Sequence, residues 1–326
     1  MPLAENQPPR THHHGGIIPV PDDLLAAPVG VALLDRLESA QRGMTHSGVL
    51  ADSDPAAVEG ATEKVELMPI GQLLHLALNA AASLAGPWNG DAPDSLALAY
   101  QLCEPRRPLA EAVWRRVAGA LLGPVRADAQ EHWRCELHPQ LPIDPAVSDF
   151  SRVYGNGEFP RAGFWTVSAP PREIHHDLLN AWEMFCAPVS RWRMPVASSV
   201  KVWNIDHPAD RVRLVETFPK MAAKPHAGWE LPGPNQHRTE VERLASVPGQ
   251  HALRTAVGRH VLPDWAAVAR EYDGVHLSWA GFLTAEGFVS DLPDRGATML
   301  RYWSSERTLW LREVLGRPEA LEASLV

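Results

Sequence analysis

The fold is decided by the stretch from Asp264 to Leu311, which reads DWAAVAREYDGVHLSWAGFLTAEGFVSDLPDRGATMLRYWSSERTLWL. Asp264 is a residue type that commonly caps helices, and Trp265, Val268 and Tyr272 follow it at helical spacing. The next two residues are Asp-Gly, a turn signal that would end the helix. The first part of this stretch therefore predicts a short capped helix.

Three strands are expected in the rest of this stretch, at Val275–Trp279, Met299–Trp303 and Glu306–Leu311. The first of them has an apolar residue at every second position, which is typical of a strand with one buried face. Glu306 places a carboxylate at the beginning of the last strand, which is apolar and rich in aromatic residues. Such an acid is a candidate for chemistry, and the alternative is a solvated turn residue.

The first part of the chain has a different pattern, in which apolar residues recur at helical spacing. About five amphipathic helices are expected there, and they would form a small bundle. Asp54 and Pro55 are a cap followed by a first-turn proline. The clearest apolar stripes are Leu33, Leu34 and Leu37, then Leu73, Leu74, Leu78 and Ala81, and then Leu109, Val113, Trp114, Val117 and Leu121.

Composition changes towards the middle of the chain. Ten of the 12 Trp and all 7 Phe lie beyond residue 130, where short strands replace the Leu- and Ala-rich helices. We therefore expect a disordered tail at residues 1–20, a helical domain at residues 21–140 and a second domain at residues 141–318. Strands and helices do not alternate regularly in the second domain, which predicts an α+β class with a mixed, mainly antiparallel sheet.

Charge and composition exclude several classes of function. The net charge is −9, which argues against a large basic surface for nucleic acid. No apolar run approaches the roughly 20 residues of a membrane helix, and the first residues lack the apolar core of a signal peptide. Three widely spaced Cys indicate a reducing compartment. A cytoplasmic protein without a membrane partner is expected, although export without a cleaved signal stays open.

Motifs for phosphate-binding loops, dinucleotide folds, serine hydrolases and zinc proteases are absent from the sequence. His132, Cys135 and His138 recur at three-residue spacing, but a zinc site would need a fourth ligand at matching spacing. No metal is therefore expected. His276 stands in the first predicted strand and is either a general base or a hydrogen-bonded structural histidine.

Three short stretches carry the remaining signal, and they occur in a particular order. They are SRVYG at residues 151–155, GFWTVS at residues 163–168 and SERTLWL at residues 305–311. The series of an arginine strand, a hydroxyl strand and a glutamate strand resembles the R-S-E pattern of the ADP-ribosyltransferases. The chain is also similar to a group of proteins from high-GC bacteria. This resemblance covers residues 150–312 and implies an ADP-ribosyltransferase-like fold, NAD as substrate and a toxin-like activity.

The resemblance also implies roles for individual residues. Arg152 would hold the phosphate or ribose of NAD, and Arg161 is the competing choice for that arginine. Thr166 and Ser168 would shape the nicotinamide pocket. Glu306 would be the catalytic residue that stabilises the oxocarbenium-like ribose.

Two aromatic side chains are candidates for stacking on the nicotinamide ring, namely Tyr154 and Trp165. One departure from the family pattern concerns the acceptor. Members that modify arginine carry a second Glu or Gln two residues before the catalytic Glu, and Ser304 stands at that position here. Water, a nucleic acid or a small molecule then competes with a protein as the acceptor of ADP-ribose.

Two other classes of function compete with this expectation. A non-catalytic binding module would use the aromatic-rich second half as an interface for a protein or ligand. A metal-dependent hydrolase would use some of the 15 His.

Overall fold

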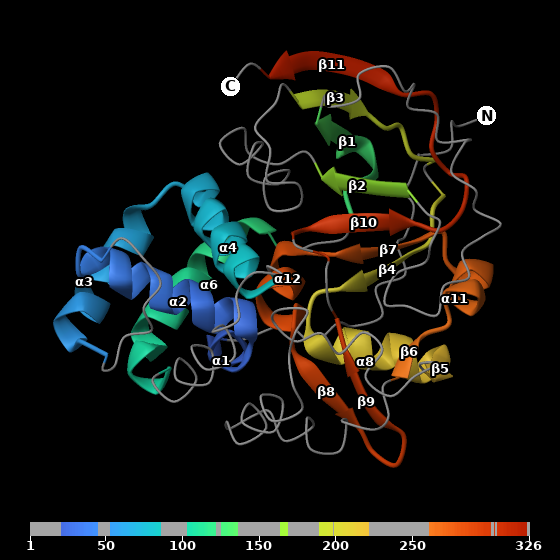
Figure 1. Cartoon of the computed structure of the whole chain (residues 1–326). Coiled ribbons are helices and arrows are strands. Elements are labelled where there is room, and N and C mark those ends of the chain that lie inside the picture. Colours follow the sequence, from blue (N-terminus) through green and yellow to red (C-terminus); the bar gives the residue numbers. More distant parts are fainter. Residues whose placement is uncertain are drawn as a thin grey trace, which may run out of the picture.

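A computed structural model describes residues 21–44, 53–85, 103–121, 125–135, 164–168, 189–197, 199–221, 261–300, 303 and 305–324. These residues form a group of helices and a mainly antiparallel sheet, so the chain is of the α+β class (Figure 1). The arginine strand expected at residues 151–155 lies outside the described residues.

The N-terminal helices are α1 (Pro21–Ala26), α2 (Pro28–Gln41), α3 (Pro55–Leu67), α4 (Ile70–Ala85) and α6 (Arg107–Leu121). The cap at the start of α3 is confirmed, because the Asp54 carboxylate accepts a hydrogen bond of 3.0 Å from the backbone N–H of Ala56. A short 3-10 turn (Glu104–Arg106) leads directly into α6. The apolar stripes read from the sequence on α2, α4 and α6 are buried where they are described, from Leu33 on α2 to Val117 on α6.

Within the described residues, seven strands form the main sheet in the order β11-β3-β1-β2-β10-β7-β4. Their bounds are β1 (Gln130–Cys135), β2 (Phe164–Ser168), β3 (Val189–Arg193), β4 (Val202–Ile205), β7 (Gly274–Leu277), β10 (Arg307–Trp310) and β11 (Glu319–Ser324). All neighbouring pairs are antiparallel except β4 and β7. Strand β10 thus lies between β2 and β7, near the middle of the sheet (Figure 1).

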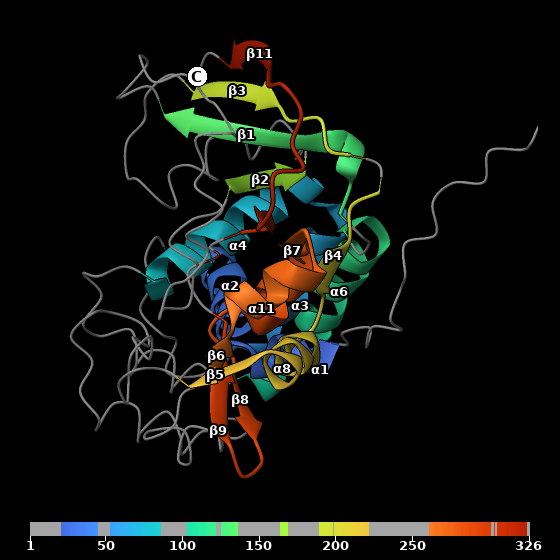
Figure 2. The ribbon, with the colours of Figure 1, turned by 90° about the vertical axis from the view of Figure 1, so that its right-hand side faces the viewer.

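Two smaller strand pairs lie beside the sheet, β5 (Pro219–Met221) with β6 (Val261–Pro263) and β8 (Val289–Leu292) with β9 (Gly296–Met299). Helix α8 (Pro208–Thr217) packs against both pairs. Figures 1 and 2 both show the β8–β9 hairpin projecting below the sheet, on the side away from β11. Helix α11 (Trp265–Glu271) begins as predicted, since the Asp264 carboxylate accepts hydrogen bonds from Ala266 and Ala267.

The structure corrects the first predicted strand in two respects. Strand β7 is buried on both faces, because helices cover one side and polar side chains of neighbouring strands pack on the other. Trp279 does not continue the strand but begins α12 (Trp279–Ala285). The side chain of Ser278 caps this helix by accepting a hydrogen bond of 3.1 Å from Gly281, and Ser is a favoured cap residue.

The bounds of the other two predicted strands differ in the structure. Met299 is the last residue of β9 and Leu300 forms an isolated bridge with Glu286, while residues 301 and 302 of the strand expected at Met299–Trp303 lie outside the described residues. The strand predicted at Glu306–Leu311 is β10, which begins one residue later, at Arg307, so Glu306 lies directly before it. Residues 130–135 fall within the helical domain expected at residues 21–140. They form strand β1 instead, which pairs with β2 and β3 in the sheet.

Helix α12 connects the bundle to the sheet, since it packs against α1, α2, α6, α8 and β7. A Cβ atom at Gly281 would lie 2.1 Å from the carbonyl oxygen of Ile205, so only glycine permits this close approach to β4. One hydrophobic core runs from the bundle through α12 to one face of the sheet, where it includes Val275 and Leu309. The predicted boundary near residue 140 lies outside the described residues.

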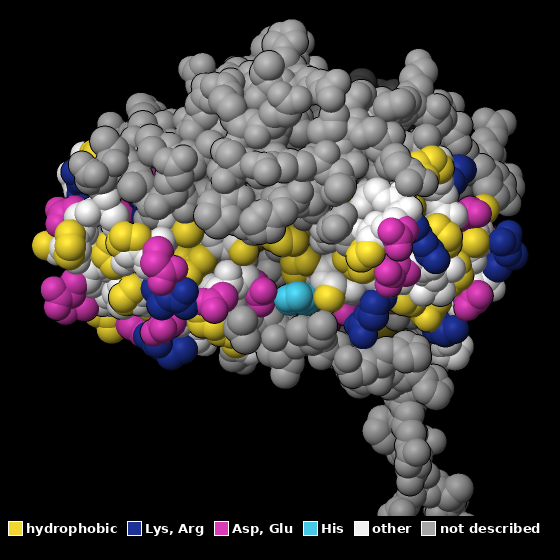
Figure 3. All heavy atoms as spheres, turned by 90° about the horizontal axis from the view of Figure 1, so that it is seen from below, with side chains coloured by type: hydrophobic (Ala, Val, Ile, Leu, Met, Phe, Trp, Pro, Cys, Tyr) yellow, Lys and Arg dark blue, Asp and Glu magenta, His cyan; other side chains and the backbone are white. Residues whose placement is uncertain are grey.

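Figure 3 shows acidic and basic side chains mixed on the face of the molecule seen from below, on both its bundle end and its sheet end. No helix in the described part of the chain is long and apolar enough to cross a membrane.

Candidate active site at the entrance of strand β10

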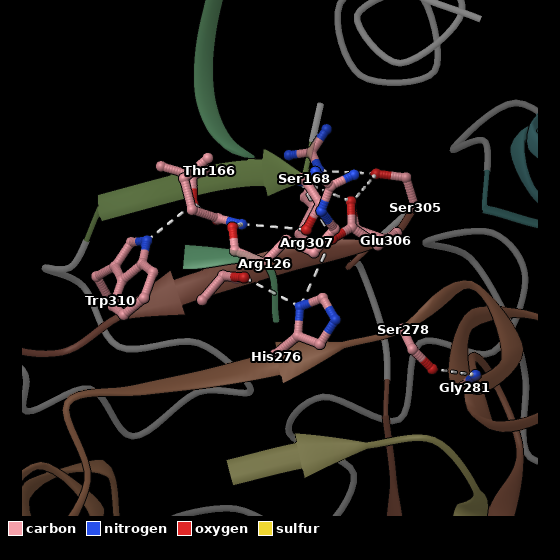
Figure 4. Close-up of polar contacts among 12 residues, drawn as sticks. Arg126, Thr166, Ser168, His276, Ser278, Gly281, Ser305, Glu306, Arg307 and Trp310 are labelled. Atoms are coloured by element: carbon pink, nitrogen blue, oxygen red, sulfur yellow. Dashed lines mark hydrogen bonds and ion pairs between the residues drawn. The ribbon is translucent and has the colours of Figure 1, made fainter. Parts of the chain in front are cut away.

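The register of three central strands gathers polar side chains on one face of the sheet. Thr308 on β10 is opposite Thr166 on β2 and opposite His276 on β7. Paired residues in a sheet point to the same face, and so do residues two apart on one strand. Ser168 and Glu306 therefore join these three residues on one face (Figure 4).

Glu306 is the centre of this group. Both of its carboxylate oxygens accept the backbone N–H of Ser168, at 3.2 and 3.1 Å. Oε1 lies 3.6 Å from Nδ1 of His276. Only 3% of the residue is exposed, so Glu306 is not a solvated turn residue. Burial raises the pKa of its carboxyl group to about 8, although hydrogen bonds from Ser168 and the charge of Arg307 act in the opposite direction.

His276 is buried to a similar degree on the neighbouring strand. Its Nδ1 lies 3.0 Å from the hydroxyl oxygen of Thr308. Burial lowers the pKa of the imidazole to about 4. Because the pKa of Glu306 lies above neutrality and that of His276 below it, both side chains are uncharged at neutral pH.

A chain of hydrogen bonds fixes the strand that supports Glu306. The amide of Gln130, which is fully buried, donates to the Ser168 hydroxyl at 3.1 Å and accepts from the Thr166 hydroxyl. The indole N–H of Trp310 donates to the same Thr166 oxygen at 2.8 Å. Side chains from β1, β2 and β10 are thereby joined, which holds the backbone N–H of Ser168 in place against the carboxylate.

Arg307 places a positive charge next to this group. Its Nε donates a hydrogen bond of 3.0 Å to the hydroxyl of Ser305. Burial lowers the pKa of the guanidinium to about 10, while the charges of Glu306 and Glu286 act in the opposite direction. The guanidinium therefore stays charged at neutral pH beside a carboxyl group that is protonated.

The structure brings together three of the residues singled out in the sequence, Thr166, Ser168 and Glu306. Trp165 points to the opposite face of β2, where its ring packs edge-on against Trp303 at a centroid distance of 5.0 Å. This arrangement gives no support to stacking of Trp165 on a ligand beside Glu306. The candidates Arg152, Tyr154 and Arg161 lie outside the described residues.

Two members of the group were not singled out in the sequence. Thr308 is invisible there because a threonine in a strand is ordinary, and its role comes from pairing with β7. Gln130 is distant in sequence, and only the pairing of β1 with β2 brings it to Ser168. Neither role could be predicted from the sequence, because a single polar residue in a strand does not by itself indicate a function.

His132, Cys135 and His138, whose spacing did not suffice to predict a metal site, are only partly described. His132 and Cys135 lie on β1, and Nδ1 of His132 lies 3.0 Å from the carbonyl oxygen of Trp165. Within the described ranges, no three His, Cys, Asp or Glu side chains are grouped so that they could hold a metal ion.

Comparisons of the chain with protein-family models, with curated proteins and with solved structures gave no match.

The two buried groups make the stability of the protein depend on pH in opposite ways. The pKa of Glu306 is raised from 4.5 to about 8, so its contribution to folding is full below pH 4.5 and is lost as pH rises through about 8. The pKa of His276 is lowered from 6.5 to about 4, so its contribution is full above pH 6.5 and is lost as pH falls through about 4. Of these two groups, only Glu306 makes stability depend on pH above neutrality.

We therefore expect the wild type to lose stability relative to Glu306→Gln as the pH rises. Between about pH 7 and about pH 9, the unfolding free energy should fall by about 1.4 kcal/mol. The reason is that folded Glu306 still binds a proton over much of this range, whereas unfolded Glu306 has already lost it. Urea unfolding of both proteins at both pH values measures this difference. A parallel pH dependence of the two proteins would show that Glu306 ionises as an exposed carboxyl group does.

Proposed function

We propose that the protein cleaves the bond between nicotinamide and ribose in NAD, and transfers the ADP-ribose to an acceptor or to water. One observation carries this proposal. The end of the hydroxyl strand and the beginning of the glutamate strand, which are far apart in sequence, meet where the N–H of Ser168 binds the Glu306 carboxylate. The proposed fold is ADP-ribosyltransferase-like, with β2 and β10 as its hydroxyl and glutamate strands.

The chemistry suits a buried carboxylate. Cleavage of the glycosidic bond passes through a ribose with oxocarbenium character, in which positive charge develops on the ring. A carboxylate held at this position stabilises charge that exists mainly in the transition state, and it does so more strongly where water is excluded. Ser168 holds the orientation of the Glu306 carboxylate through both oxygens, so little reorganisation is needed during the reaction.

The reaction requires Glu306 to be ionised. A protonated carboxyl group has no charge with which to stabilise a cation. In the enzyme without NAD, the pKa of about 8 keeps Glu306 protonated at neutral pH. The pyridinium ring of NAD carries a positive charge, and a cation bound beside Glu306 would favour ionisation. In this proposal NAD is the substrate, and Arg152 or Arg161 binds its phosphates through a planar guanidinium fork.

The test is release of nicotinamide from NAD by the purified protein over a range of pH. The ratio kcat/KM reports ionisation in the free enzyme. We therefore expect it to rise about tenfold per pH unit below the pKa of about 8 and to level off above it.

Two results would contradict the proposal in different ways. A value of kcat/KM that does not change between about pH 6 and about pH 9 would exclude ionisation of Glu306 as a requirement. No release of nicotinamide with water or with any class of acceptor would favour the non-catalytic binding module.

A further inference from the structure

His276 lies beside Glu306 but has no role in the reaction as described so far. Its Nδ1 is 3.0 Å from the Thr308 hydroxyl oxygen and 3.6 Å from Oε1 of Glu306. Figure 4 shows this nitrogen of His276 facing Glu306. The two contacts at Nδ1 fix the orientation of the ring, and Nε2 is separated from Nδ1 by one ring carbon.

We infer that His276 is the general base that removes a proton from the acceptor in the reaction proposed above, on which this inference rests. The acceptor oxygen forms a bond to C1′ of the ribose. The bond between C1′ and nicotinamide breaks, and its electron pair stays on the nicotinamide nitrogen, which leaves neutral. The acceptor proton moves to Nε2 of His276 and then to solvent.

The state of the imidazole fits this role. Its lowered pKa, which is caused by burial, keeps it unprotonated and able to accept a proton throughout the neutral range. Once Glu306 is ionised, its Oε1 lies 3.6 Å from Nδ1 and favours the imidazolium that forms. The ionised Glu306 can only accept, so it favours the tautomer with hydrogen on Nδ1, and the Thr308 hydroxyl can also accept from that N–H; the lone pair is then on Nε2.

The charged and titratable groups around the pair are consistent with this assignment. Arg307 precedes Thr308 on the same strand, and its charge favours ionised Glu306. On the other side of His276, β4 contributes Asn204, which is paired with it in register and is uncharged. The sequence has serine rather than an acid at position 304, so a carboxylate two residues before Glu306 is not available as the base.

A histidine base also restricts the class of acceptor. An imidazole can assist removal of a proton from water or from a hydroxyl group as the new bond forms. A guanidinium, in contrast, has no available lone pair and must lose a proton before it can attack, and a weak base such as a neutral imidazole cannot remove that proton. The acceptor is therefore water or an alcohol, such as the hydroxyl group of a sugar or nucleoside, and not a protein arginine.

The experiment compares His276→Gln with a matched control, His132→Gln. His132 lies on β1 of the same sheet, and its contacts include the carbonyl oxygen of Trp165 and the rings of Phe164 and Trp192. Glutamine can keep a hydrogen bond to Thr308 but cannot act as a base at neutral pH. With water as acceptor, we expect kcat for nicotinamide release to fall about 100-fold in His276→Gln and to stay at the wild-type value in His132→Gln.

Sodium azide then separates a base from a structural residue. Azide is an anionic nucleophile that carries no proton, so its attack on C1′ needs no base. It should restore nicotinamide release by His276→Gln, with ADP-ribosyl azide as the product, and should not restore release by Glu306→Gln. Wild-type release should be slower in D₂O with water as acceptor, but not with azide.

Each outcome has a clear meaning. Wild-type kcat in His276→Gln, or a loss that azide does not restore in a folded variant, would overturn the assignment of His276 while leaving the proposed function intact. If His276→Gln does not fold by circular dichroism, His276→Asn is the second variant. The D₂O comparison needs no variant, and equal isotope effects with water and azide would also overturn the assignment. No release by the wild type would overturn the proposed function itself.

Discussion

Glu306→Gln is expected to lower kcat for nicotinamide release by about 100- to 1000-fold, which corresponds to about 3–4 kcal/mol of transition-state stabilisation. Glutamine keeps the size of the side chain and can still accept the Ser168 N–H, but it has no negative charge. Because that charge acts mainly in the transition state, the affinity for NAD should fall much less than kcat. Nicotinamide release at saturating NAD measures the first effect and a binding titration the second.

The matched control is Glu313→Gln, which removes an exposed carboxylate from the segment just after β10. This variant should keep the wild-type rate and change stability by no more than about 0.5 kcal/mol. Circular dichroism checks that both variants are folded. A folded Glu306→Gln that keeps the full rate would remove this residue from the mechanism.

The local parts of the fold could be predicted because each is specified by residues close in sequence. The caps Asp54 and Asp264 mark the first turns of α3 and α11, since a short acidic side chain satisfies the free N–H groups of a helix start. At Ser278 the local signals disagree. The apolar alternation before it predicts that the strand continues to Trp279, whereas Ser278 caps helix α12. Two local signals competed there, and tertiary packing around Gly281 decided between them.

The candidate site could be predicted only in part, because its geometry comes from strand pairing. The sequence indicated Thr166, Ser168 and Glu306 as members of one site, and the order of the strands brings them together. It did not indicate that Trp165 points to the other face. A shift of one residue in the register between β2 and β10 would exchange the two faces, and no short motif specifies that register.

The burial of Glu306 and His276 likewise could not be predicted from the sequence. An acid at the entrance of a strand is equally compatible with a solvated turn and with a buried site. What distinguishes them is the burial of Glu306, whose contacts are with Ser168 and His276, about 140 and 30 residues away along the chain respectively. The raised pKa of Glu306 and the lowered pKa of His276 both follow from burial.

A second buried charge cluster lies in the helical bundle and has a structural role. Arg106, which is fully buried, donates to Glu38 at 2.6 Å and to Asp35 at 2.8 Å. Glu38 also accepts the backbone N–H of Asp54 at 2.7 Å and the hydroxyl of Ser53. This cluster therefore ties the turn before α6 to α2 and to the start of α3.

Arg106→Met is expected to destabilise the protein by about 3–5 kcal/mol, because it leaves the carboxylate of Glu38 buried without its positive partner. The control is Arg115→Met, whose partner Glu66 is 40% exposed in its side chain, and which should cost no more than about 1 kcal/mol. Urea unfolding followed by circular dichroism measures both values. Adding Glu38→Gln to Arg106→Met should recover part of the loss, since the amide oxygen still accepts from Asp54 while the unpaired charge is gone. If Arg106→Met cost no more than Arg115→Met, the buried cluster would not stabilise the bundle, and packing of the α2, α4 and α6 stripes alone would hold it.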